Sequence, residues 1–362
     1  MDKKGSKLSV ALGITFVWFT TQFGGGFASG AQLKSYFIRY GIYCLFTCIG
    51  AQAICAVYNA YIAYFAKKHG TYDYRSFNNA FYGKFSKIFS PLFEIVYIFV
   101  LLVVPAVAFS TGGSTLNTLT GVPYMLCTAI VRKVATLLSI LIVAGLLVVF
   151  IPNIIVQWDS VTAGIASLNA VDMPIGPALW SMLVYAAFQI ASSPAIHSQH
   201  SEALQEPKDS VMTYVIGFIV NSVMIFISTI GLMAIVTTQE YADASMPVLV
   251  LIQNGVGGKI LLPILSILII LGSVSTAVNM VSAGTARVCN MIDPNYDPDG
   301  KPTAKVIVTT LVLCLVGFGV AQFGLLPLVN KGYGALAYLT FPVIMIPYIV
   351  HAIYTRLDTK EA

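Results

Sequence analysis

Three consecutive glycines, residues 24–26, interrupt a strongly apolar segment near the start of the chain, residues 8–33. Glycines cost helix stability and provide no side chain for packing, but they allow a ligand to approach the backbone. A half-helix that begins near Phe27 would direct free N–H groups and a positive dipole end towards an anion. The alternative is close helix packing through Gly26 and Gly30. That pair accounts for one helix face only, so the pattern favours a binding site.

A second apolar segment, residues 175–203, is interrupted by Ser192, Ser193 and Pro194. Pro194 has no N–H, and its ring clashes with the carbonyl four residues back, so backbone acceptors near Ile190 are released. Released carbonyls suit an ammonium group or a metal cation. A simple proline kink is the alternative.

The two interruptions fall at corresponding places in the two halves of the chain. Unpaired backbone groups are costly in lipid, so irregular backbone persists there only where it lines a cavity or binds something. Paired breaks of this kind are the sequence pattern that indicates the binding site of a transporter. The sequence therefore predicts a site between the two interrupted helices.

Hydroxyl side chains are concentrated in a later apolar segment, residues 259–290, which contains Ser273, Ser275 and Thr276. Ser275 and Thr276 are adjacent, so they cannot both face the lipid. Hydroxyl and carbonyl oxygens together form a weakly charged site of the kind that hard cations such as Na⁺ accept. The alternative is that each hydroxyl bonds a carbonyl of its own helix.

The composition predicts that these segments lie in a lipid bilayer. Hydrophobic residues make up 57% of the 362 residues and charged residues 10%, with a mean hydropathy of +0.82. Soluble domains carry about 25% charged residues. A spanning helix needs about 20 apolar residues, and ten candidate segments are present. They are residues 8–33, 41–66, 88–118, 123–150, 153–170, 175–203, 210–238, 259–290, 304–326 and 333–355.

The ten segments divide into two halves of five, residues 1–172 and 173–362, within a single membrane domain. Each half opens with its interrupted segment, and because five is odd, the second half enters the membrane from the opposite side. The sequence therefore predicts an all-α integral membrane protein with a five-plus-five inverted repeat, in which helices 1 and 6 are discontinuous.

The limits of helices 4 and 5 are the least defined part of this map. Arg132 and Lys133 are costly inside a membrane, so residues 122–133 are expected to form in part an external helix, with the fourth span at 134–150. Residues 153–170 are polar for a spanning helix. We therefore expect the fifth helix to be enclosed by the others.

The distribution of Lys and Arg predicts the orientation. More of them fall in loops on the side of the N-terminus, so both termini are expected in the cytoplasm of a multi-pass plasma (inner) membrane protein. The apolar run after the basic N-terminus is too long for a cleavable signal, so it should be retained. The basic residues lie at helix ends, which does not indicate a nucleic-acid partner.

Several short stretches resemble a known family. Residues 24–30, Gly-Gly-Gly-Phe-Ala-Ser-Gly, resemble the Gly-x-Gly-Phe-Ala-Ser-Gly signature of YkvI-type bacterial membrane proteins. Residues 183–186, 246–249 and 275–278, with Ala286-Arg287 behind the last, resemble further parts of these proteins. The family belongs to the amino acid–polyamine–organocation superfamily and has the LeuT-type fold.

This resemblance implies a substrate site between helices 1 and 6. It also implies a Na⁺ site formed by the carbonyls of Thr20 and Phe23 with the hydroxyls of Ser275 and Thr276. Phe27 falls where sodium-coupled relatives with a second ion carry an amide side chain, so the resemblance implies one Na⁺ only.

We therefore expect a secondary active transporter that moves a small amino acid, amine or related zwitterion or organic cation by alternating access. Na⁺ is the expected coupling ion, no other cofactor is expected, and the partners are the small substrate and the lipid bilayer. The alternatives are a non-transporting sensor or structural membrane protein with the same fold, and a proton-coupled or uncoupled transporter. No span carries a nucleophile–base pair, which argues against an enzyme.

The expected substrate-binding residues adjoin the breaks: Phe23, Gly24, Gly25, Gly26, Phe27, Ser29, Phe109, Tyr185, Gln189, Ser192 and Ser193.

Overall fold

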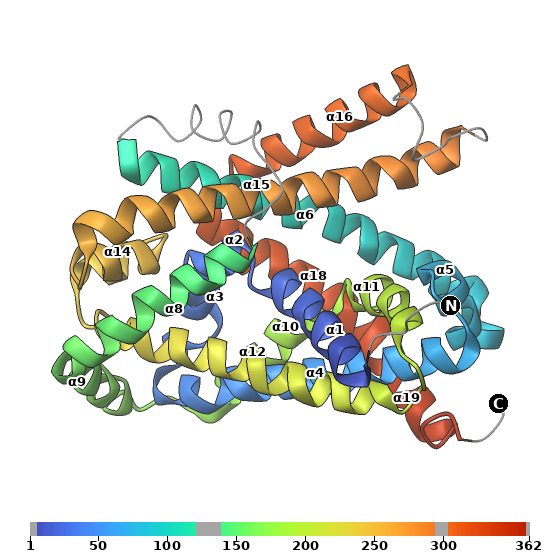
Figure 1. Cartoon of the computed structure of the whole chain (residues 1–362), viewed down its shortest axis with the longest axis horizontal. Coiled ribbons are helices and arrows are strands. Elements are labelled where there is room, and N and C mark those ends of the chain that lie inside the picture. Colours follow the sequence, from blue (N-terminus) through green and yellow to red (C-terminus); the bar gives the residue numbers. More distant parts are fainter. Residues whose placement is uncertain (1–5, 121–138, 294–302, 360–362) are drawn as a thin grey trace.

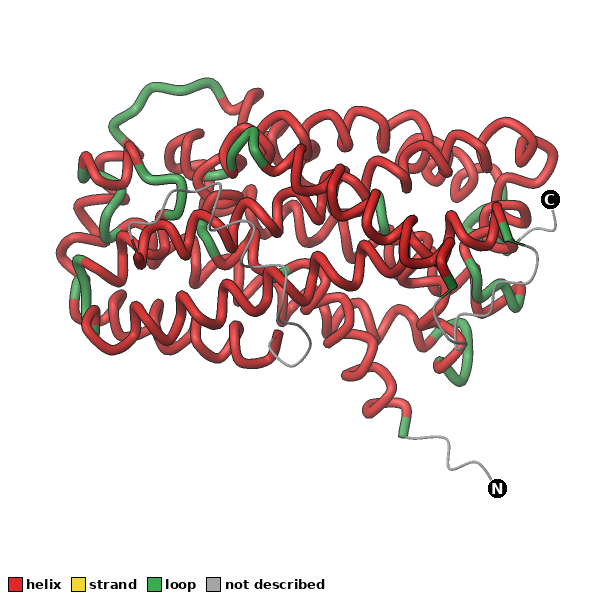
Figure 2. Tube along the Cα trace, turned by 90° about the horizontal axis from the view of Figure 1, so that it is seen from above, coloured by secondary structure: helices red, strands yellow, loops and turns green. Residues whose placement is uncertain are grey.

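The computed structural model of the chain describes residues 6–120, 139–293 and 303–359. Within these ranges all regular structure is helical and no strand is present. Long helices lie alongside one another and give the molecule an elongated outline (Figures 1 and 2). The all-α class predicted from the composition is confirmed.

The first apolar segment is interrupted where the glycines predict it. Helix α1 (Lys7–Gln22) ends at Phe23, whose φ of −99° and ψ of 41° leave the helical region. Helix α2 (Gly25–Ala28) is a single turn, and α3 (Ala31–Tyr36) begins after Gly30. Gly30 has a φ of 80°, a left-handed conformation that glycine adopts without strain.

The second interruption is also present. Helices α10 (Ile175–Ile190) and α11 (Ser193–His200) are separated by Ala191 and Ser192 and differ in direction by 54°. Pro194 lies in the first turn of α11, where the missing N–H would have no helical partner anyway. The proline therefore permits a new helix to begin at this point.

The remaining helices connect and surround these two segments. They are η1 (Ile38–Tyr43), α4 (Cys44–His69), α5 (Tyr74–Tyr82), η2 (Gly83–Phe85), α6 (Ser86–Thr120), α8 (Ser139–Val156), α9 (Trp158–Asn169), η4 (Ser201–Ala203), α12 (Asp209–Met233), α13 (Gln239–Asp243), α14 (Pro247–Gln253), α15 (Gly258–Ile292), α16 (Ala304–Ala321), α17 (Leu325–Pro327), η5 (Leu328–Gly332), α18 (Tyr333–Thr340), η6 (Phe341–Met345) and α19 (Ile346–Tyr354). The last five form one nearly continuous rod.

Six of the described helices are long and apolar enough to span a membrane, and two bent pairs raise the number to at most eight. One pair is α10 with α11, and the other is α8 with α9, which meet at 88°. The chain is thus a multi-pass helical membrane protein. The expected ten helices and the inverted repeat of residues 1–172 and 173–362 stay predictions, and residues 122–133 lie outside the described part.

The predicted fifth span does not form one straight helix. Helix α9 has 12 residues, so it rises only about 18 Å, less than the roughly 30 Å of a hydrocarbon core. The expected enclosure of residues 153–170 is only partly correct, because Asn153 is buried whereas the bend turns much of α9 outwards. The exposed polar residues are Asp159, Ser160, Thr162 and Asn169.

Two groups of helices enclose the interrupted segments. Helices α6 and α15 pack along each other with α16 against both, while α12 packs on α4 and α1. In Figure 1 the first group lies above and the second below, with α1, α2 and α10 in the middle. The breaks therefore lie inside the bundle, whereas apolar side chains of α16 such as Val308 and Leu315 face outwards, as lipid contact requires.

The start of α1 and the end of α19 lie at the same end of the molecule (Figure 1). Lys7 pairs with Asp209 at 3.0 Å, and Lys68 pairs with Asp358 at 2.9 Å. Each pair joins segments that the Lys and Arg distribution assigns to the same side of the membrane. The structure therefore agrees with both ends of the chain lying on one side, and the cytoplasmic identity of that side stays a prediction.

Candidate functional site

A cavity of about 60 Å³ lies where the two interrupted segments meet. One water needs about 10–15 Å³ of such volume, so the cavity holds roughly four to six waters or a solute of similar size. The lining comes from both breaks and from α3, α6, α15 and α18. Its residues are Thr21, Gln22, Gly24, Gly26, Phe27, Gln32, Val100, Val104, Val107, Ala108, Phe188, Gln189, Ser192, Thr276, Met280, Tyr333 and Leu336.

The break in helix 1 exposes backbone to this cavity. The Gly24 carbonyl accepts hydrogen bonds from the N–H groups of Phe27 and Ala28, at 3.0 and 3.1 Å. The sequence predicted a free Phe27 N–H for an anion, but this N–H is bonded to the Gly24 carbonyl. Helix α2 is also too short for a strong dipole, because the dipole sums over aligned peptide units. The carbonyls of Thr20 and Phe23 accept no hydrogen bond from any described donor.

Gly26 leaves space that a side chain would fill. A Cβ at this position would lie 3.1 Å from Cγ1 of Val107 and 3.5 Å from Nε2 of Gln32. The hydroxyl of Tyr333 would lie at 3.8 Å. Glycine here brings the backbone, an amide and a phenol hydroxyl together at one wall of the cavity.

The break in helix 6 forms the opposite wall. Gln189 donates from Nε2 to the Tyr185 hydroxyl at 3.1 Å, which fixes the orientation of its amide. Phe188 stacks on Tyr333 with ring centroids 4.5 Å apart and an angle of 8°. The Ile190 carbonyl accepts no hydrogen bond from a described donor, as expected when proline is four residues later. The wall thus combines two stacked aromatic rings with an oriented amide, and the unbonded Ile190 carbonyl lies next to them in the chain, outside the lining.

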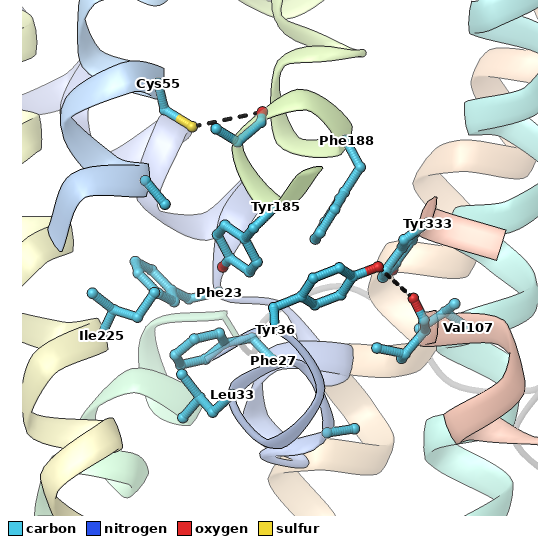
Figure 3. Close-up of a cluster of buried hydrophobic side chains, with 14 of the residues drawn as sticks. Phe23, Phe27, Leu33, Tyr36, Cys55, Val107, Tyr185, Phe188, Ile225 and Tyr333 are labelled. Carbon is cyan, nitrogen blue, oxygen red and sulfur yellow. Dashed lines mark hydrogen bonds between the residues drawn. The ribbon is translucent and has the colours of Figure 1, made fainter. Parts of the chain in front are cut away.

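Figure 3 shows an aromatic cluster beside this site, with Phe23, Phe27, Tyr36, Tyr185 and Phe188 pointing towards one another. Phe23 and Phe27 meet edge to face at 4.5 Å, and the Tyr36 hydroxyl donates to the Val329 carbonyl at 2.6 Å. Tyr36 on α3 also packs against Tyr185 and Phe188 on α10, with ring centroids 5.7 and 5.3 Å apart, and so links the two interrupted segments.

Six of the predicted site residues line the cavity: Gly24, Gly26, Phe27, Gln189, Ser192 and Thr276. Six others do not: Thr20, which is partly exposed, and the buried residues Phe23, Ser29, Phe109, Tyr185 and Ser193. Ser29 has a structural role, because its hydroxyl donates to the Gly26 carbonyl and accepts from the Ala31 N–H. Phe109 faces α16, where a Cβ on Gly317 would lie 3.4 Å from its ring.

One residue of the predicted sodium site, Thr276, lies beside the break in helix 1. Oγ1 of Thr276 would lie 3.1 Å from a Cβ on Gly24, so α15 touches helix 1 at its break. The Thr276 hydroxyl donates to the Gly272 carbonyl at 3.0 Å, which is the back-bonding alternative, but its lone pairs stay able to accept a cation. The surroundings of Gly25 and Ser275 lie outside the described part.

The sequence reasoning missed two amides and a phenol that line the cavity. Gln22 and Gln32 lie on either side of the first break and are each 4% exposed. Both Gln22 amide atoms and Oε1 of Gln32 have no hydrogen-bond partner among the described residues. Two glutamines in an otherwise apolar segment were the available signal. Tyr333 carried no such signal, because it lies far away in sequence.

The lining is electrically neutral. It contains no Asp, Glu, His, Lys, Arg or Cys, and the described residues contain no group of three or more His, Cys, Asp or Glu side chains able to hold a metal. The site can therefore donate and accept hydrogen bonds and contact a cation through oxygen and aromatic faces. It has no lining group that titrates near neutral pH.

No protein-family model and no curated protein sequence matches the chain. Its structure is similar to that of the Eremococcus coleocola manganese transporter, solved in complex with an aromatic bis-isothiourea-substituted compound. The TM-score is 0.63 at 13% sequence identity, and the match covers 99% of this chain and 82% of the transporter. At this identity the likeness establishes a shared fold.

Proposed function

We propose that this chain is a secondary transporter that moves a small polar solute across the membrane by alternating access. One observation carries the proposal: the interruptions of two helices from different halves of the chain line the same cavity. Irregular backbone at that depth is costly unless it binds something. The shared fold with a known transporter supports the same conclusion.

The chemistry of the lining favours an amino acid, an amine or a related zwitterion or organic cation. The stacked rings of Phe188 and Tyr333 suit an ammonium group. The amides of Gln22, Gln32 and Gln189 can donate to a carboxylate or a hydroxyl. The cavity volume favours the smallest members of this class, because larger solutes would require the walls to move.

Manganese does not fit the cavity. Divalent transition metals are generally held by carboxylate, imidazole or sulfur ligands, and the lining offers only Met280 among these. The cargo of the structurally similar transporter is therefore not proposed for this chain.

Na⁺ is the coupling ion that we propose, held by the carbonyls of Thr20 and Phe23 with the hydroxyls of Ser275 and Thr276. The absence of hydrogen bonds to these carbonyls from described donors supports it, as does the contact between Thr276 and Gly24. A proton would need a titratable group, and the cavity lining has none.

Uptake into proteoliposomes tests the proposal. The purified protein is first screened by thermal shift against amino acids and amines, with Na⁺ or choline as the cation, because a ligand of the folded state raises the unfolding midpoint. Each hit is then assayed for saturable uptake driven by a Na⁺ gradient. Ligand binding without uptake under any ion gradient would instead identify a non-transporting sensor.

A further inference from the structure

Three buried amides have no hydrogen-bond partner at either polar atom. They are Gln22 on α1, Gln52 on α4 and Asn221 on α12, with exposures of 4%, 0% and 0%. Neither the nitrogen nor the oxygen of any of them has a partner among the described residues. Buried polar groups in native proteins are almost always hydrogen-bonded, so this group requires an explanation.

The packing of α1 on α12 brings Gln22 opposite Asn221. The Thr15 hydroxyl donates to the Thr213 carbonyl at 3.0 Å, and a Cβ on Gly217 would lie 2.6 Å from the ring of Trp18. From the first contact to the second, the residue numbers increase on both helices, so α1 and α12 run parallel here. One further turn from Trp18 and Gly217 reaches Gln22 and Asn221.

Helix α4 brings Gln52 to the same level from the other side. The Cys48 thiol interacts with the Thr229 hydroxyl, while Ala56 lines a surface groove together with Tyr214. Sequence numbers therefore increase along α4 while they decrease along α12. Position 52 falls halfway between these two contacts, and position 221 falls close to halfway on α12.

The chemistry of the three amides selects their ligand. Each has two N–H donors and one oxygen with two lone pairs, and the three amides form no hydrogen bond with one another. A metal cation would leave the N–H groups unpaired, and an anion would leave the oxygens unpaired. Water donates and accepts, and buried water typically occupies sites with two to four polar partners.

Gln22 links this group to the central site. Its side chain also lines the cavity between the two breaks, and its amide lies near the Tyr185 hydroxyl without reaching hydrogen-bond geometry. Gln22 can therefore contact water on one side and the cavity on the other.

We propose that Gln22, Gln52 and Asn221 enclose a hydrated compartment between α1, α4 and α12, and that Gln22 joins it to the central cavity. The water forms hydrogen bonds with the three amides, and it keeps the side of the helix 1 break that faces α4 and α12 polar. The compartment depends on no particular transported solute.

Accessibility of introduced cysteines to a small, water-borne methanethiosulfonate tests this proposal in the full-length protein. Asn221→Cys is compared with Ile225→Cys, which lies one turn later on the same helix and is equally buried at 0%. Mass spectrometry of the individual peptides reports each site separately. The native Cys289, also 0% exposed, serves as an internal reference on α15.

We expect Asn221→Cys to react roughly tenfold faster than Ile225→Cys, because a thiol reacts only where water and reagent reach it. Gln52→Cys should likewise react faster than Cys289, which keeps the test valid if Asn221→Cys fails to fold. Equal rates at the polar and apolar positions would overturn the compartment. Protection of Asn221→Cys by Na⁺, compared with choline, would mean that a cation occupies the site and would overturn the assignment to water.

The connection through Gln22 is tested by adding Gln22→Leu to the Asn221→Cys chain. Leucine fills similar space without polar atoms, so labelling at position 221 should fall towards the rate of Ile225→Cys. An unchanged rate would overturn the role of Gln22 as the link.

Discussion

A Cβ atom on Gly24 would lie 3.1 Å from Oγ1 of Thr276, so the interrupted backbone of helix 1 touches a hydroxyl of α15. This contact joins the predicted substrate site to the predicted ion site. A cation held by Thr276 would lie beside the backbone that we propose binds the solute. Binding of the cation would then be coupled directly to binding of the solute.

Thr276→Val should weaken any Na⁺ dependence of uptake or binding. Valine keeps the shape of threonine but removes the oxygen ligand, and a loss of about 1–3 kcal/mol corresponds to a roughly 5- to 150-fold higher Na⁺ requirement. The measurement is the Na⁺ concentration for half-maximal uptake. Thr310→Val is the control, because Thr310 bonds the Val306 carbonyl on α16 and does not line the cavity. An unchanged Na⁺ requirement in Thr276→Val would remove Thr276 from the ion site.

Gly26→Val should abolish solute binding while the protein still folds. Its Cβ would lie 3.1 Å from Cγ1 of Val107, and the added methyl groups would occupy the cavity. Gly13→Val on the same segment is the matched control, because a Cβ there meets nothing within 4 Å. Thermal-shift titration measures binding. If both variants bind solute equally, Gly26 serves packing and not recognition.

Gln32→Leu should reduce solute affinity, because the amide lines the cavity with an unpartnered Oε1. The loss of one hydrogen bond to the solute costs about 1–3 kcal/mol, which predicts a roughly 5- to 150-fold rise in the dissociation constant. Gln322→Leu is the control, since Gln322 donates to the Phe318 carbonyl and lies outside the cavity. Equal affinities in the two variants would contradict the assignment of Gln32.

Asp73→Ala should lower the stability of α5 by about 1 kcal/mol, because Asp73 caps this helix. Its carboxylate accepts from the N–H groups of Arg75 and Ser76 at 3.0 and 2.9 Å. Partial burial raises the pKa of Asp73, but hydrogen bonds from Ser76 and Arg75 outweigh it and hold the pKa below its ordinary value.

The sign of the pH dependence follows from that depressed pKa. The carboxylate stabilises the folded state above the ordinary pKa of aspartate, and the contribution is lost as the pH falls through the pKa of the folded state. The gap in unfolding midpoint between the parent chain and Asp73→Ala should therefore narrow in acid. Asp73→Asn, which still caps but does not titrate, is the control. A gap independent of pH would contradict the role of the charge.

The interruptions of both helices were determined by the sequence alone. Glycine and proline change the backbone through local sterics and a missing N–H, so Gly24, Gly30 and Pro194 act wherever the rest of the chain lies. The membrane class was equally readable, because it depends on composition. The length of helix α9 was not, since its 88° bend arises where the chain packs against its neighbours.

Only the tertiary structure decided which side chains face the cavity. The cavity is reached by Gln22, Gln32 and Tyr333 because three separate segments pack together. By contrast, the Ser29 hydroxyl, beside the first break, bonds the Gly26 carbonyl, and Phe109 on α6 packs against Gly317 on α16. Spacing along one helix defines a face, but the neighbours of that face depend on how helices distant in sequence pack. The convergence of α1, α4 and α12 on three unpartnered amides is a result of that packing.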